Sequence, residues 1–248
     1  MTTSSRRPSG APVNHQGRRL GGTANPKSTR RRPALRIHKN LMLAAGAALV
    51  IVGIMAGLLV SASPAPATAV VTGPPGPEKV PLEEGRLLAS ATTAARGAPV
   101  DGISCNANEQ VAYHVHTHLS VYVNGVLRPI PAGIGIVHPV AVPTAHGSFD
   151  EATQCYYWLH VHAQDGVIHI ESPTQRSYTL GQFFDIWRQP LGRAQVAGAK
   201  GHLTIFVNGR RYLGNPRAIR LGSRESIQID VGRPLVAPRS VPWKGTGL

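Results

Sequence analysis

Residues 111–125 read VAYHVHTHLSVYVNG, and their pattern predicts the type of fold. Apolar side chains share one parity along it, and histidines occupy the other. The histidines are His114, His116 and His118. A side-chain period of two is that of a β-strand, so the strand has an apolar face and a histidine face. Asn124-Gly125 then favours a two-residue hairpin turn, because both residues tolerate positive φ.

The end of this stretch recurs further along the chain. Residues 118–125, HLSVYVNG, match residues 202–209, HLTIFVNG, with five of eight positions identical. We predict two related hairpins, in which His202 takes the place of His118. The alternative is coincidence between two ordinary hairpins, since alternating apolar residues followed by Asn-Gly form a common string.

A third hairpin is predicted over residues 156–172, around a two-residue Asp-Gly turn. That turn length pairs His162 with His169, and His160 with Glu171. Directly opposed residues share one face of the sheet, with Cβ atoms about 4.5–5.5 Å apart. The predicted register therefore gathers these four side chains into one patch, and a slip of one residue would scatter it.

The patch consists of ligands that first-row metals accept. Zinc binds histidine nitrogen at about 2.0–2.1 Å, and copper(II) also accepts imidazole. All three methionines precede the predicted folded domain, which excludes a Met-rich copper(I) site there. We therefore predict a zinc or copper(II) site with ligands from the set His160, His162, His169, Glu171, His114, His116, His118 and His202. The alternative is a polar or pH-responsive sheet face, because imidazole titrates near pH 6.5.

Two cysteines, Cys105 and Cys155, each precede a histidine strand. In an oxidising compartment such a pair forms a disulfide. Closing the loop of 50 residues stabilises the fold by about 4 kcal/mol in the chain-entropy description. The alternative is a thiolate that binds the metal.

The N-terminal part predicts a membrane anchor. Residues 1–40 hold ten Lys/Arg and no acid, and their composition predicts a disordered basic tail. Residues 41–60 form an uncharged apolar run of 20 residues, long enough to cross a bilayer as a helix. Positive charge stays cytoplasmic, so we expect a single-pass cell-membrane protein whose C-terminal domain is extracytoplasmic. A cleaved signal peptide is the alternative.

We interpret the basic tail as a signal that sets the orientation of the protein in the membrane. No aromatic residue is interleaved among its charges, so we expect no nucleic-acid partner. After the span, residues 61–100 are predicted as a Pro/Ala-rich extracytoplasmic linker. Residues 101–234 form the predicted His-rich β domain, and residues 235–248 are predicted as a disordered end.

One helix is expected inside the domain. Thr179 and Gln182 fit a capping box, and Leu180, Phe183 and Trp187 follow a helical apolar spacing. The predicted fold is therefore β-rich α+β, with antiparallel hairpins as a small sandwich or partly open barrel. It carries one short amphipathic helix and is preceded by a single transmembrane helix.

Two longer motifs resemble a known group of proteins. Residues 157–173 read YWLHVHAQDGVIHIESP, and residues 180–187 read LGQFFDIW. They are similar to membrane-anchored or secreted His-rich proteins of bacteria and archaea that share an LHxH…GVIHIE and LGQFFxIW signature. The resemblance covers residues 105–232 and implies that the histidine segments belong to one domain. It assigns no reaction.

Other catalytic templates are absent from the sequence, including GxSxG, the Walker loop, GxGxxG and HExxH. We predict metal capture, buffering or delivery at the histidine-lined sheet face. One alternative is a metalloenzyme that activates water or oxygen, with Glu171 or Asp165 as the base. Another is a metal-free envelope module whose histidine face meets a partner of unknown identity.

Overall fold

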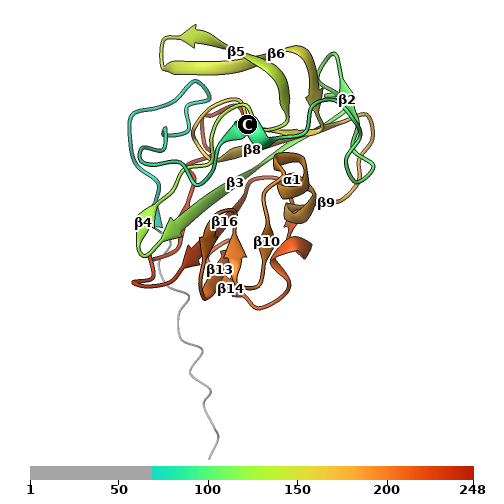
Figure 1. Ribbon diagram of the computed structural model, residues 1–248. Helices are drawn as coiled ribbons and strands as arrows, with labels where there is room; N and C mark the ends of the chain where they lie inside the picture. Colours follow the sequence, from blue (N-terminus) through green and yellow to red (C-terminus); the bar gives the residue numbers. More distant parts are fainter. Residues whose placement is uncertain (1–68) are drawn as a thin grey trace, which may run out of the picture. The chain divides into compact units, whose positions relative to one another are not determined.

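The computed structural model describes residues 69–248 (Figure 1). The predicted basic tail, the predicted transmembrane helix and the first part of the predicted linker lie outside the described residues. Between residues 69 and 248, no helix is both long and apolar enough to cross a membrane. The described residues confirm a β-rich α+β fold with a single α-helix, whereas the finer description as a sandwich or partly open barrel remains a prediction.

The central feature is a seven-stranded sheet built around the long strand β3 (Tyr113–Val123). Figure 1 shows β3 crossing the domain, with β8 and β16 close to it. The strand order is β14-β13-β16-β3-β8-β7, and β4 pairs with β3. The other members are β4 (Val126–Leu127), β7 (Leu159–His160), β8 (Val167–Ser172), β13 (Leu203–Val207), β14 (Arg210–Tyr212) and β16 (Glu225–Val231).

Both predicted Asn-Gly hairpins are confirmed. The β3–β4 and β13–β14 pairs are antiparallel, and each leaves a two-residue connection. Asn124 and Asn208 have φ values of 51° and 50°, as a type I′ turn requires. The sheet is nevertheless mixed, because β16 runs parallel to β3. Such a pair needs a long crossover connection, which hairpin signals do not reveal.

The third hairpin has a register that differs from the predicted one. His160 pairs with His169, whereas the sequence predicted Glu171 opposite His160. The reason is a longer connection: Val161 N–H donates to the carbonyl of Ile134 instead of continuing the ladder. Since the shift is by two residues, side-chain parity is kept and the predicted patch stays on one face.

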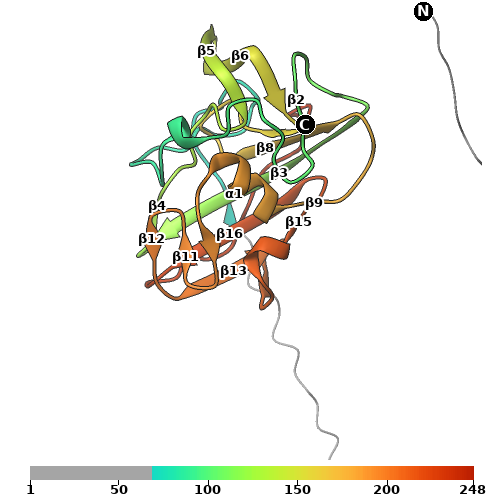
Figure 2. The same ribbon diagram turned by 45° about the vertical axis from the view of Figure 1, so that its right-hand side comes forward.

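The predicted helix is α1 (Leu180–Trp187), and its capping box between Thr179 and Gln182 is confirmed. Figure 2 shows α1 in front of the sheet. Phe183 and Trp187 are fully buried in one core with Ile170 of β8. The apolar face of the sheet therefore packs against the helix, which leaves the histidine face on the opposite side.

A three-stranded sheet adds β2 (Cys105–Asn106), β6 (Gly147–Tyr157) and β5 (Ile136–Thr144), in the order β2-β6-β5. Figure 1 shows the β5–β6 hairpin at the top of the view. Short pairings complete the fold. They involve β1 (Ala69–Val70) with β17 (Arg239–Ser240), β9 (Tyr178–Thr179) with β15 (Arg220–Leu221), and the trio β10 (Leu191–Gly192), β11 (Gln195–Val196) and β12 (Ala199–Lys200). The 3-10 turns are η1 (Ala91–Thr93) and η2 (Pro216–Ala218).

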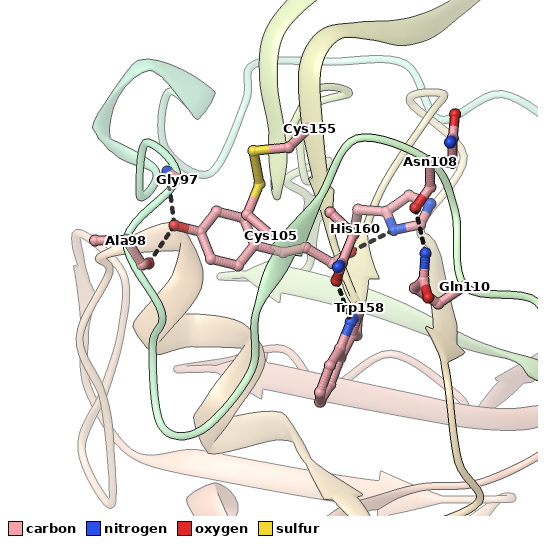
Figure 3. The surroundings of a disulfide bond; sticks show 10 residues. Gly97, Ala98, Cys105, Asn108, Gln110, Cys155, Trp158 and His160 are labelled. Atoms are coloured by element: carbon pink, nitrogen blue, oxygen red, sulfur yellow. Dashed lines mark hydrogen bonds between the residues drawn. A yellow bond between two sulfur atoms is a disulfide. The ribbon is translucent and has the colours of Figure 1, made fainter.

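The predicted disulfide between Cys105 and Cys155 is confirmed, with a Cα–Cα distance of 5.4 Å. It joins β2 to β6, and Figure 3 shows it near His160. Tyr157 beside it accepts a hydrogen bond from Gly97 N–H at 2.8 Å. Because both sulfurs are bonded to each other, neither is a thiolate ligand, which corrects the alternative drawn from the sequence.

The segment from residue 69 to residue 100 packs onto the rest of the domain. Glu83 N–H donates to the carbonyl of Gln164 at 2.7 Å, and Val80 is fully buried. At the other end of the chain, Val241 forms a small apolar cluster with Val80 and Val167. The Pro-rich composition predicted an extended linker and a disordered end. Composition did not reveal these contacts, because they depend on the three-dimensional positions of individual valines such as Val80 and Val241.

Candidate metal centre

The sheet topology places a row of histidines across three strands. His116 of β3 pairs with His169 of β8, and His169 pairs with His160 of β7. Ring centroids are 4.5 Å apart for the first pair and 5.2 Å apart for the second. His114 and Glu171 form the next opposed pair on the same face. The two histidine segments therefore meet because β3 and β8 are neighbours.

His160 and His162 face each other through their Nε2 atoms, which are 2.9 Å apart. The Nδ1 atom of each ring forms a hydrogen bond with a backbone carbonyl. His160 bonds to the carbonyl of Tyr157 at 2.8 Å, and His162 bonds to that of Asp150 at 2.6 Å. A carbonyl oxygen only accepts, so each Nδ1 carries the ring's proton. In two neutral rings both Nε2 atoms then present lone pairs to each other, and such a contact needs a cation between them.

The electrostatics around His160 favour its neutral form. Burial, together with the charge of neighbouring His162, holds the pKa of His160 well below its usual range. Phe149 stacks on the His162 ring at a centroid distance of 4.1 Å and fixes its plane. His160 is thus a neutral nitrogen donor, which is the form that metals bind, and the His162 ring is held in place beside it.

A second nitrogen pair lies on β3. His114 Nε2 is 3.0 Å from His116 Nε2 and 2.9 Å from Glu171 Oε1. Burial lowers the pKa of His116 to about 2, and the charges of neighbouring histidines add to this effect. His116 is therefore a neutral donor as well, and Glu171 adds an oxygen beside the pair.

His169 lies between two carboxylates. Its Nδ1 is 3.1 Å from Glu171 Oε1, and its Nε2 is 2.9 Å from Glu78 Oε1. Burial by itself would lower the pKa of His169, but Glu78 and Glu171 raise it to about 10. In the metal-free protein His169 is therefore a cation that compensates buried carboxylate charge.

Glu109 lies at the rim of the cluster. Its Oε1 is 3.1 Å from His162 Nε2 and 3.9 Å from His160 Nε2. The hydrogen bond from His162 lowers the pKa of Glu109, despite an opposing effect of burial. Its side chain is 34% exposed, so the His160–His162 pair is reached from solvent on this side.

These contacts define three overlapping groups whose donor atoms lie within 4.8 Å of one another. The groups are His114, His116, His169 and Glu171; His160, His162 and His169; and Glu109, His160 and Glu171. Six of the eight ligands predicted from the sequence are thus brought together. We call this set, with Glu109, the histidine–glutamate cluster.

His118 and His202 lie outside these groups. His118 is 2% exposed, and its Nε2 is 3.5 Å from Glu83 Oε1. Burial raises the pKa of Glu83 to about 8 and lowers that of His118 to about 4. His202 is exposed before β13, on the far side of β16 from β3. The predicted equivalence of the two residues is therefore not an equivalence of position around the cluster.

Sequence reasoning missed the carboxylates Glu78, Glu83 and Glu109. Glu78 and Glu83 fall in the predicted linker, and Glu109 precedes the first histidine strand. One signal was present: none of the 12 acids occurs before Glu78. Of the acids in the predicted linker, Glu78 contacts His169 of the cluster and Glu83 contacts His118.

Comparisons with known proteins add no relative. No protein family, no curated protein and no solved structure matches the chain. The resemblance drawn from the sequence therefore remains a prediction. The fold and the site together define a β-rich α+β domain with a buried histidine–glutamate cluster that is suited to a metal ion.

Proposed function

We propose that this protein is a single-pass, membrane-anchored, extracytoplasmic protein that captures, buffers or delivers zinc or copper(II). The observation that carries the proposal is the 2.9 Å contact between His160 Nε2 and His162 Nε2, while both Nδ1 atoms donate to backbone carbonyls. Histidines that bind metals almost always donate their other ring N–H to a carbonyl, carboxylate or water, which orients the ring.

The donor set fits these two metals. Two nitrogens on one tetrahedral zinc ion lie about 3.3 Å apart, close to the separation of the two Nε2 atoms. Imidazole and carboxylate suit zinc and copper(II), and residues 69–248 contain no methionine for a copper(I) site. The chemistry of the side chains therefore supports the same metals that the sequence predicted.

Exchange with solvent favours capture and delivery over a purely structural ion. Two members of the cluster reach the surface: His114 is 40% exposed and Glu109 is 34% exposed. Structural zinc sites are closed by four protein ligands, whereas this cluster keeps an accessible side. Metal can therefore enter and leave past these two residues.

The extracytoplasmic location rests on two independent features. The apolar run at residues 41–60 follows a basic stretch, which favours an anchor with the C-terminal domain outside. The Cys105–Cys155 disulfide fits an oxidising compartment. Mass spectrometry of the mature protein tests the anchor. A mass that includes residues 1–40 supports it, and a mass that lacks residues 1–40 and the apolar run contradicts it.

A metalloenzyme is the second candidate function. The observation that favours it is the partly exposed Glu109 beside His162, because a carboxylate at an open coordination position can take a proton from metal-activated water. Glu109→Gln separates the two candidates, since it would abolish hydrolytic or oxidative turnover while metal binding persists through the histidines.

The proposal is tested by elemental analysis of the full chain. The untagged protein is produced through a secretory route, purified in detergent and dialysed. We expect at least one equivalent of zinc or copper, with less metal in His162→Ala than in the matched control His202→Ala. A chain that holds no metal, and whose melting temperature is unchanged by zinc or copper(II), contradicts the proposal and leaves the metal-free binding module.

A further inference from the structure

We infer that the histidine–glutamate cluster binds two metal ions bridged by the carboxylate of Glu171, an inference that rests on the proposed function. The geometry begins with the strand order β3-β8-β7, which places Glu171 on the middle strand. The His114–His116 pair lies on β3, and His160 lies on β7 with His162 just after it. Two nitrogen pairs thus flank one carboxylate.

The two oxygens of Glu171 face different pairs. Oε1 is 2.9 Å from His114 Nε2, whereas Oε2 is 3.9 Å from His160 Nε2. A distance of 3.9 Å is too long for a hydrogen bond. It is within the range of two atoms bound to the same ion, which lie at most about 4.4 Å apart when each bond is about 2.2 Å.

The outer oxygen lacks any other partner. Glu171 is 2% exposed, and among the described residues its Oε2 has no hydrogen bond. A buried carboxylate oxygen without a partner is strongly unfavourable, so such atoms are normally paired or bind a metal. A cation held with His160 and Glu109 supplies that partner, and these three residues form one of the groups with converging donor atoms.

Each nitrogen pair has the geometry of its own chelating site. The Nε2–Nε2 distance is 3.0 Å for His114 and His116, and 2.9 Å for His160 and His162. Glu171 belongs to a group on each side. His169 is also shared between groups, but its nitrogens face Glu78 and Glu171, so the carboxylate is the better bridge. Ions bridged in this way are typically about 3.5–4 Å apart.

The test is a copper(II) titration of the full-length chain in detergent, followed by binding stoichiometry and electron paramagnetic resonance. We expect two equivalents to bind. The first gives a mononuclear signal, and the second lowers the signal per copper because the two ions couple through the bridge. Glu171→Gln is expected to bind one equivalent with an uncoupled signal.

A second variant keeps the inference testable if Glu171→Gln fails to fold. His114→Ala removes a 40% exposed side chain from the β3 pair, so the fold tolerates the loss. It is expected to bind one uncoupled copper at the His160–His162 pair. The matched control His202→Ala is expected to bind two coupled ions, as the unchanged protein does.

The outcomes separate this inference from the proposed function. One equivalent in the unchanged protein, or two equivalents that stay uncoupled, overturns the bridged pair and leaves metal binding intact. Unaltered stoichiometry and coupling in Glu171→Gln also overturns the bridge. No bound copper and no bound zinc overturns both the inference and the proposed function.

Discussion

The β3–β4 and β13–β14 hairpins share a similar eight-residue segment at the end of the first strand and the turn, and they lie on opposite sides of β16. β3 runs parallel to β16, and β13 runs antiparallel to it. Their apolar positions meet in common rows, for example Val121, Ile229 and Ile205. The shared residues therefore have the same structural role in both hairpins, since they form an Asn-Gly turn and an apolar face.

What differs is the second neighbour and the length of the strand. β3 has β8 on its other side, which brings His169 and Glu171, whereas β13 has the short β14. β3 also begins five positions before His118, and this extension carries His114 and His116. The chain before His202 instead turns through β12 in a separate sheet. The repeated segment thus determines the turn and the apolar face of each hairpin. The neighbouring strand determines whether metal-binding side chains lie beside it.

The largest expected contrast between the hairpins is in stability. Leu119→Ala removes a fully buried side chain of β3 and is expected to lower the free energy of unfolding by about 3–5 kcal/mol. Leu203→Ala, the equivalent change in β13, removes a partly exposed side chain and is expected to have less than half that effect. Denaturant unfolding measures both free energies, and equal losses would contradict the expected difference between the two hairpins.

A smaller contrast concerns pH, because His118 lies beside buried Glu83. The raised pKa of Glu83, about 8, means that its protonated form stabilises the fold and that this stability is lost as pH rises from about 4.5 through 8. The lowered pKa of His118, about 4, has the opposite effect: it makes the stability increase as pH rises from about 4 to about 6.5. Between pH 6.5 and 8 the His118 effect no longer changes, and Glu83 lowers the stability by about 2 kcal/mol. His169, whose pKa is raised to about 10, adds a decrease of the same sign in this range.

The measurement is the free energy of unfolding of the metal-free chain at pH 6.5 and pH 8. Glu83→Gln, which stays neutral, is expected to make the decrease smaller and to leave the part that comes from His169. His202→Ala serves as the control and is expected to keep it. A decrease of the same size in Glu83→Gln would assign the pH dependence to another group.

The smallest expected effect is from moving histidines into the second hairpin. Gly198→His combined with Lys200→His restores the i, i+2 spacing before His202. A side chain fits at position 198, because a Cβ there meets no atom within 4 Å. These positions lie in the β11–β12 turn and in β12, without a β8-like neighbour. We expect zinc affinity at this hairpin to stay at least 100-fold weaker than at the cluster in a competition titration.

The sequence was sufficient for features that depend on local backbone geometry. The parity of β3, the Asn-Gly turns and the Thr179–Gln182 capping box each follow from a few adjacent residues. The disulfide followed from having two cysteines and a predicted oxidising compartment. Six of the eight predicted ligands came together because side-chain parity survives a register error of two residues.

The remaining features depend on contacts between distant segments. The β7–β8 register changed because Val161 bonds to Ile134, a contact that no local pattern encodes. The carboxylates Glu78 and Glu109 reach the histidines from segments without periodicity. His202 was misplaced because similarity between two strings says nothing about which strand lies beside each.

The position of Glu78 has a mechanical consequence. Glu78 lies on the segment that leads from the predicted anchor into the domain, and it contacts His169 of the cluster. β1 comes earlier on this segment and pairs with β17. Tension along the chain from its N-terminal side would therefore load the β1–β17 pair first and the Glu78–His169 contact next. The Glu78 contact with the cluster would therefore be loaded before the hydrogen bonds between β3, β8 and β7.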